Sequence, residues 1–348
     1  MTSTGLHQIA LEDTGVRIAP DERRGFFTAA GPPTPPLRPT QARTLRLLNV
    51  VLSAGAAFLA ILAGRRLFGT ERGKTYFTIL AVAFPKAPVV GGLINNDNLA
   101  LLAGSLVFAG LVFSGPARRS AGRLLLGLGL AVAGWVKLTA LVAFGAAAFA
   151  VLLLRTRDDA LDRRTVLAFA AGGALGSLPY LETVMRTGHL LYVNTAQFFV
   201  PVGLRPDLGF AGYVAYFVQA LALKWPAVEF SNTRPWVALG LLSLIGAATV
   251  FGLFVRKAGR PLALGYTAAT VVFFAIHLWF GWNAFRDMGD MTIAQTRYYA
   301  VLWPGLAVSL AGGCLWLARR RPALAAGVIT LTLLPTVAGS IVMQLMAG

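Results

Sequence analysis

Residues 124–154 read LLLGLGLAVAGWVKLTALVAFGAAAFAVLLL, an apolar run that contains a single charged side chain, Lys137. As one α-helix this run would be about 46 Å long, at about 1.5 Å per residue, whereas the hydrocarbon core of a bilayer is about 30 Å thick. The run is therefore too long for one comfortable span and short for two. The basic residues at its two ends, Arg123 and Arg155, decide between one crossing and two.

The basic residues of the chain gather in short connections between apolar runs. Seventeen of the 31 lysines and arginines lie in residues 65–74, 116–123, 155–164, 256–260 and 319–322. Short basic connections mark the cytoplasmic side of a membrane protein, so all five are expected on one side. Arg123 and Arg155 can share a side only if the chain crosses twice between them. We therefore predict a hairpin of two short helices that turns at residues 135–139.

The composition agrees with a membrane protein. The 348 residues are 56% hydrophobic and 13% charged, with a mean hydropathy of +0.67, which is too apolar for a soluble domain of this size. The net charge of +17 then reflects membrane topology and not a nucleic-acid partner. We predict an all-α polytopic transmembrane bundle of about ten spans. The spans are expected at residues 45–64, 75–94, 98–115, the two halves of 124–154, 165–184, 236–255, 261–281, 298–317 and 323–345.

The outer face then receives the remaining connections. These are residues 1–44, the turn at residues 95–97, a loop at about 185–235 and residues 282–297. Ten of the fourteen carboxylates lie on this outer face or at its border. This distribution places any acid/base chemistry outside the cytoplasm, although the membrane topology alone would produce the same distribution. We assign residues 45–348 to one transmembrane domain.

The amino-terminal 44 residues form a separate, Pro-rich extracytoplasmic segment. They hold no apolar core of a signal peptide, and their prolines favour an extended, lipid-free chain. A basic tail exported without a preceding helix runs against the positive-inside bias. We therefore expect a first transmembrane helix upstream of this segment, with a small exported tail as the alternative.

Asp97 is the first candidate for chemistry. It follows Asn95 and Asn96 in a turn of a few residues between two predicted spans. A carboxylate held at the membrane surface is costly unless it is paired or used. Asn96 or Asp97 can equally cap the helix that follows, and the two roles are compatible.

Three cations are candidates for binding a phosphate. Lys137 lies at the predicted turn, where it can hold a lipid phosphate or snorkel to the interface beside Trp135. Arg297 opens a span on the outer face, where its guanidinium can grip phosphate oxygens or anchor the helix with the two tyrosines that follow. Lys86 lies between two prolines in a span that they are expected to break, so it can line a site.

Other polar residues favour structural roles. His277 is expected to be packed and hydrogen-bonded, and with His7 and His189 elsewhere it assembles no metal site. One cysteine, Cys314, excludes a disulfide framework within the chain and a CxxC zinc cluster. Gly-rich stretches at residues 127–134 and 172–176 are expected to mark helix-packing faces. Aromatic residues at near-helical spacing from residue 210 to 225 predict a helix on the outer leaflet, which roofs a site or covers the bundle.

Four groups of residues carry a resemblance to a known superfamily. They are ARTLRLLNV and GRRLFG at residues 42–50 and 64–69, INNDNLA at residues 94–100, GLAVAGWVKLTA at residues 129–140 and QTRYYAVLWP at residues 295–304. From about residue 42 onward, the chain resembles the multispanning GT-C glycosyltransferases. The resemblance is to bacterial members related to protein O-mannosyltransferases and to an uncharacterised bacterial integral-membrane family. The motifs stand in the same order and on the matching side of the predicted membrane.

The resemblance implies a glycosyltransferase of the bacterial plasma membrane that moves a hexose or pentose from a polyprenyl-phosphate carrier to an extracytoplasmic acceptor. By analogy, Asp97 or the pair of Asp21 and Glu22 would be the acid/base group, and Lys137 and Arg297 would hold the lipid phosphate. The implied partners are the polyprenyl-phosphate-linked sugar and membrane lipid, with no nucleic acid. No cofactor or metal is identified.

The chain departs from this pattern at its amino terminus. The first helix and much of the first outer loop of the superfamily, with its acidic site, have no full counterpart, and Asp21 and Glu22 look like a remnant of that site. A lysine at position 86 is also unexpected for the superfamily. A polytopic transporter or lipid flippase without transferase activity is the alternative: Lys86 in a broken helix favours it, and the lack of an internal repeat and of a buried carboxylate partner disfavours it. A noncatalytic membrane scaffold is the third hypothesis.

Overall fold

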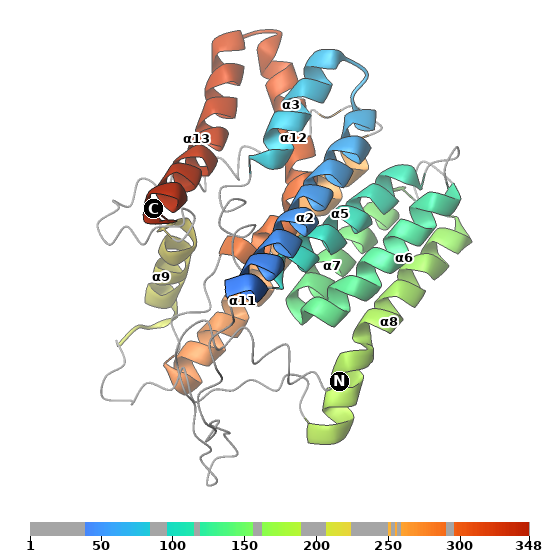
Figure 1. The fold of residues 1–348 in the computed structure, drawn as a ribbon, viewed down its shortest axis with the longest axis vertical. Helices are drawn as coiled ribbons and strands as arrows, with labels where there is room; N and C mark the ends of the chain where they lie inside the picture. Colours follow the sequence, from blue (N-terminus) through green and yellow to red (C-terminus); the bar gives the residue numbers. More distant parts are fainter. Residues whose placement is uncertain are drawn as a thin grey trace.

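The computed structural model describes residues 39–83, 96–114, 119–155, 162–188, 207–223, 250–251, 255, 259–289 and 296–347. Throughout these ranges the regular structure is helical, and the helices pack side by side as one bundle (Figure 1). The α-helices are α2 (Pro39–Gly64), α3 (Glu71–Val82), α5 (Asp97–Phe113), α6 (Arg119–Val136), α7 (Leu138–Arg155), α8 (Arg163–Thr187), α9 (Phe210–Leu223), α11 (Arg260–Met288), α12 (Trp303–Ala318) and α13 (Pro322–Ala347). Two 3-10 helices, η1 (Arg65–Leu67) and η6 (Thr296–Leu302), join some of them.

The predicted spans match these helices. Each predicted span except 236–255 has a helix over all or part of its range; that one lies almost entirely outside the described residues and stays a prediction. Within the described ranges, four helical segments are long and apolar enough to cross a membrane, namely Arg43–Leu67, Leu138–Arg155, Arg260–Asp287 and Tyr298–Ala318. The prediction of an all-α transmembrane helical bundle is confirmed.

The predicted hairpin turns where the sequence placed it. α6 ends at Val136 and α7 begins at Leu138, so Lys137 is the one residue between them. The amide of Lys137 still donates to Ala133 O at 2.9 Å, and its own carbonyl accepts from the amide of Leu141 at 3.1 Å. Lys137 therefore closes one helix and opens the next, which fixes its backbone from both sides.

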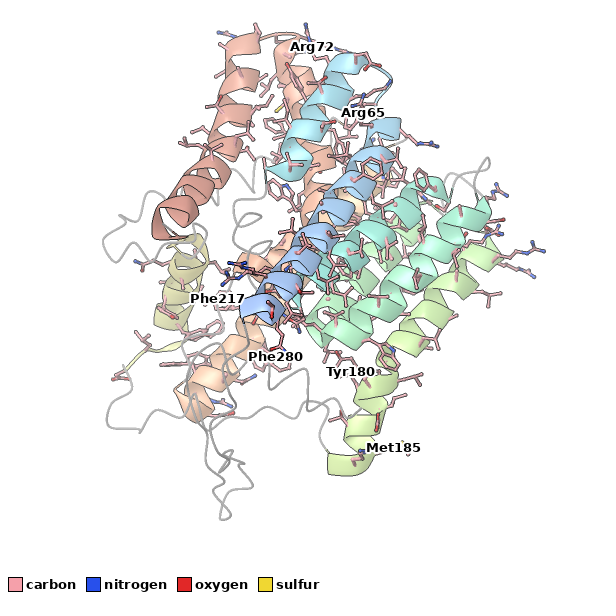
Figure 2. All side chains as sticks on the ribbon, viewed as in Figure 1. Arg65, Arg72, Tyr180, Met185, Phe217 and Phe280 are labelled. Atoms are coloured by element: carbon pink, nitrogen blue, oxygen red, sulfur yellow. The ribbon has the colours of Figure 1, made fainter. Side chains whose placement is uncertain are left out.

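The described parts of the five basic connections lie at one end of the bundle, as predicted. The contacts that join them are Arg66 over the Phe113 ring, Arg155 to Leu111 O, Arg123 to Asp162, Gly73 against Leu315 and Gly259 against Leu67. Arg65 and Arg72 mark part of this end at the top of Figure 2, whereas Met185 marks the far end of α8. We refer to it below as the basic end.

At the basic end, Asp162 precedes α8 and ties it to α6. Its carboxylate accepts hydrogen bonds from Thr165 Oγ1 at 2.8 Å, Arg123 Nε at 2.9 Å and the Arg164 amide at 3.3 Å. The hydrogen bond from Thr165, followed by that from Arg123, holds the pKa of Asp162 below its ordinary value of 3.8. The folded state therefore favours the ionised carboxylate.

Asp162→Asn is expected to lower the midpoint of thermal unfolding at pH 7 and to have little effect in acid. Because the pKa is lower in the folded chain, the stabilisation is fully present above the unfolded pKa of about 4 and is lost as the pH falls through the folded pKa. Unfolding of both proteins in detergent, followed by circular dichroism from pH 7 to pH 2, measures this. Glu182→Gln, at an exposed ion pair with Arg186, is the control. A difference that stays constant across this range would contradict the assignment.

Glycines allow α6 and α8 to approach closely. The two helices run in the same direction, and a Cβ added at Gly134 would lie 2.0 Å from Gly176 O, while one at Gly172 would lie 2.4 Å from Gly127 O. Small residues permit such backbone contact in membrane helices. The expectation of packing faces is confirmed at these positions, whereas Gly173 faces open space.

Gly134→Ala is expected to destabilise the protein by about 3 kcal/mol or more, because the added methyl group meets a backbone oxygen that cannot move aside. Gly145→Ala in α7 is the matched control, since nothing lies within 4 Å of its added Cβ. That control should be neutral or stabilise the helix by about 0.5–1 kcal/mol. Unfolding by sodium dodecyl sulfate in mixed micelles compares the two, and equal stabilities would show that α6 and α8 can separate at little cost.

Candidate functional site

Two of the predicted site residues form an ion pair at the end of the bundle opposite the basic end. Asp97 is the first residue of α5, and Lys137 lies between α6 and α7; the Lys137 ammonium donates to Asp97 Oδ1. The Asp97 side chain is 8% exposed and that of Lys137 22%. Burying two charges costs several kcal/mol per ion, so such a pair is weak evidence of stability. Ionisable groups kept within the membrane region usually serve function.

The residue before Asp97 does not have the capping role that the sequence allowed. Asn96 occupies the N-cap position of α5, but its side chain makes no capping hydrogen bond. Its Nδ2 group instead donates to Val136 O at 3.4 Å, at the end of α6. The start of α5 is thus joined to the end of α6 beside the ion pair. The capping prediction is wrong for Asn96, because its backbone is helical (φ −80°, ψ −5°) and not in the extended conformation of a residue that caps a helix.

Lys137 and Trp135 have different partners. Its ammonium pairs with Asp97 and lies 5.4 Å from the centroid of the Tyr298 ring, a distance at which a cation is attracted to an aromatic face. The Trp135 indole donates to Leu175 O of α8 at 2.9 Å. A carboxylate and an aromatic ring thus stabilise the ammonium, and its reach to the interface stays a prediction.

The ion pair lines an open cavity of about 280 Å³, counting the space open to the surroundings. The cavity lies where the start of α5, the start of α7 and η6 meet. Its lining combines the ion pair, Thr139 and Tyr298 with five apolar residues, Ala100, Leu101, Ala140, Ala300 and Val301. The cavity therefore offers one charged region next to an apolar wall.

The remaining predicted site residues are described in part or not at all. The backbone of Arg297 lies in η6, directly before Tyr298, so the structure brings this segment to the cavity. Its side chain lies outside the described part of the chain, and a contact with phosphate stays a prediction. Lys86, Asp21 and Glu22 also lie outside the described residues, so their roles stay predictions.

Tyr298 is the functional candidate that the sequence did not single out. From the sequence this tyrosine is expected only as an interfacial anchor next to Arg297, but its ring contacts Lys137 and lines the cavity. The sequence feature that could have indicated this role is the adjacent pair of tyrosines, Tyr298 and Tyr299. In a 3-10 helix of about three residues per turn, neighbouring side chains diverge, so one ring can reach the cavity while the other points elsewhere.

His277 packs against the segment that contains Tyr298 and Tyr299. It is 6% exposed and shares a hydrogen bond with the Tyr299 hydroxyl, with Nδ1 and the oxygen 3.0 Å apart. Its ring also lies 5.4 Å from that of Tyr298 and 4.9 Å from that of Phe217 in α9. The prediction of a packed, hydrogen-bonded histidine is confirmed.

The helix predicted in the loop at residues 185–235 is confirmed as α9. It packs on α11 through an aromatic cluster, with the buried Tyr213 ring stacked 5.2 Å from Phe285. Of the two roles left open by the sequence, these contacts favour covering the bundle. Across the described ranges, no group of three or more His, Cys, Asp or Glu side chains is placed to hold a metal ion.

Similarity to this chain was found among solved structures. No protein-family model matches the chain, and no curated protein matches it. Two matching crystal structures are those of ArnT from Cupriavidus metallidurans in the apo state and bound to undecaprenyl phosphate. The first is 19% identical with a TM-score of 0.35, and the match covers 77% of this chain and 62% of that chain. The second is 18% identical with a TM-score of 0.36, covering 79% and 63%. The chain thus spans less than two thirds of the length of either structure.

Proposed function

We propose that this chain is a GT-C-like membrane glycosyltransferase that moves a sugar from a polyprenyl-phosphate donor to an acceptor outside the cytoplasm. The observation that carries the proposal is the buried ion pair of Asp97 and Lys137 at an open cavity, opposite the basic end of the bundle. By the positive-inside bias the basic end is cytoplasmic, so the cavity faces outward.

The chemistry of sugar transfer matches the two charges. The acceptor hydroxyl oxygen forms a bond to the anomeric carbon, the bond from that carbon to the phosphate oxygen breaks, and polyprenyl phosphate leaves. A carboxylate is needed to accept the hydroxyl proton, and a cation is needed to stabilise the departing phosphate. Asp97 is assigned the first role and Lys137 the second.

The ion pair also suggests how the two roles are coupled. In the structure the Lys137 ammonium donates to the Asp97 carboxylate. A phosphate that enters gives Lys137 a second anionic partner, which draws the ammonium away from Asp97 Oδ1. The carboxylate oxygen is then available to accept a proton from the acceptor hydroxyl.

The rest of the cavity supports an amphiphilic donor. Its apolar residues lie next to the charges, as a headgroup attached to a hydrocarbon chain requires. Arg297, next in sequence to Tyr298, is proposed as a second phosphate ligand, because a guanidinium can grip phosphate oxygens in a bidentate manner. Lys86 is proposed to line the same site. Asp21 and Glu22 are kept as the alternative acid/base pair.

The direct test supplies the purified chain in lipid nanodiscs with radiolabelled polyprenyl-phosphate hexoses and pentoses and a panel of hydroxyl acceptors. Transfer of label from the lipid to an acceptor is the expected result. Movement of lipid across proteoliposomes without any glycosyl product would overturn the proposal in favour of the transporter or flippase hypothesis.

A further inference from the structure

Two backbone carbonyls near the candidate site lose their helical donors for different reasons. Pro179 lies inside α8 and has no N–H group, so the carbonyl of Leu175, four residues earlier, receives no helical hydrogen bond from it. α6 ends at Val136, so the carbonyl of Gly134 is among the last four of its helix, which lack intrahelical donors. Both carbonyls lie where α6 and α8 touch, and an unpaired carbonyl in a membrane is costly.

Each helix supplies the donor that the other lacks. The hydroxyl of Tyr180 in α8 donates to Gly134 O at 2.7 Å, and the indole of Trp135 in α6 donates to Leu175 O at 2.9 Å. Each donor is adjacent in sequence to one of these positions. Tyr180 follows Pro179, whose missing N–H group leaves Leu175 O without a helical donor, and Trp135 follows Gly134, whose own carbonyl lacks one. Tyr180 is labelled on α8 in Figure 2, at the level where α6 ends. We call these two hydrogen bonds the α6–α8 clasp.

We propose that Tyr180 and Trp135 are positioning residues for Lys137, holding the last turn of α6 so that the ammonium meets Asp97 at the cavity. Lys137 lies two residues beyond Trp135, and its amide is still bonded to Ala133 O of this turn. If the clasp opens, the last turn of α6 can fray and carry the lysine with it. The catalytic part of this inference rests on the proposed function, but the positioning of Lys137 does not.

Substitutions can distinguish the positioning of the last turn of α6 from the simple packing of α6 on α8. The contact between Gly134 and Gly176 already brings the two backbones together without either side chain. Tyr180→Phe keeps the aromatic ring and removes only the hydroxyl donor, whereas Trp135→Phe also removes one ring of the indole. A role of Tyr180 in packing alone would therefore survive its substitution, whereas a role in holding the turn would not; Trp135 needs a comparison in which Leu175 O has another donor.

The first experiment needs no activity. The coupling between Asp97 and Lys137 is measured by a double-mutant cycle of Asp97→Asn and Lys137→Met, using unfolding midpoints in detergent. The cycle is repeated in the Tyr180→Phe background and in a Tyr76→Phe background, a tyrosine of α3 that packs against the core. The clasp predicts that the coupling falls by more than half with Tyr180→Phe and stays unchanged with Tyr76→Phe. Equal coupling in all three backgrounds would overturn the inference.

The second experiment asks whether the backbone defect at Pro179 creates the need for Trp135. Pro179→Ala restores an N–H group that can donate to Leu175 O, so the indole becomes dispensable. The fall in unfolding midpoint caused by Trp135→Phe should therefore shrink by at least half when Pro179→Ala is also present, with Pro179→Ala alone as reference. An undiminished fall would show that Trp135 acts through bulk and would overturn its assignment.

If the wild type transfers sugar, a third measurement follows. Tyr180→Phe should then lower kcat about tenfold to a hundredfold, as expected for a misplaced catalytic group, while Tyr76→Phe should not. Unchanged kcat would overturn the catalytic part. A wild type without transferase activity, combined with the predicted loss of coupling, would refute the proposed function and leave the clasp standing.

Discussion

Asp97→Asn is expected to lower the rate of sugar transfer about 100- to 10,000-fold, the usual contribution of a positioned general base. Asparagine keeps the shape of the side chain but cannot accept the proton of the acceptor hydroxyl. Its carbonyl can still accept a hydrogen bond from Lys137, so the helix ends should remain in place. The measurement is the initial rate of label transfer in nanodiscs at saturating donor, compared with that of the wild type.

Asp287→Asn is the matched control for this variant. Asp287 lies at the end of α11, is 62% exposed and pairs with the neighbouring Arg286. It should transfer sugar at the wild-type rate. If Asp97→Asn did the same while Asp21→Asn and Glu22→Gln together abolished transfer, the acid/base role would belong to the amino-terminal pair.

Lys137→Met is expected to affect both stability and binding. Removing one member of a buried ion pair leaves the other charge uncompensated, at a typical cost of about 3–5 kcal/mol. The lower end applies here, because the lysine side chain is 22% exposed. The double variant Asp97→Asn/Lys137→Met should recover most of this loss, since no isolated charge remains. The unfolding midpoints of the two single variants and the double variant, compared with that of the wild type, test this prediction.

Binding of polyprenyl phosphate gives the second measurement on Lys137→Met. Loss of the ammonium should raise the Kd about tenfold or more, as expected when a charge-assisted hydrogen bond of about 1.5–3 kcal/mol is lost. Lys74→Met is the control, since that lysine pairs with the exposed Glu71 at the basic end. It should leave both the Kd and the midpoint nearly unchanged. Equal phosphate affinity in Lys137→Met and wild type would remove the lysine from the proposed site.

Most of the bundle was predictable from the chain alone. The hairpin at Lys137 followed from a length argument and from the charges of Arg123 and Arg155, and the structure places the turn at that residue. What the chain alone did not predict concerns single side chains, such as the contact of Asn96 with Val136 O and the ion pair of Lys137 with Asp97. In both cases the partner comes from another helix, which local sequence rules do not see.

The difference has a physical origin. In a bilayer each segment must satisfy its own backbone hydrogen bonds and expose its apolar side chains to lipid. The local sequence therefore determines where the helices lie and on which side of the membrane each basic connection lies. The meeting of Asp97 and Lys137, 40 residues apart, depends instead on how the helices rotate and how closely they pack. Glycine contacts such as that of Gly134 with Gly176 set that packing. The sequence therefore determined the helices and their directions, while only the folded bundle decided which charges share a cavity.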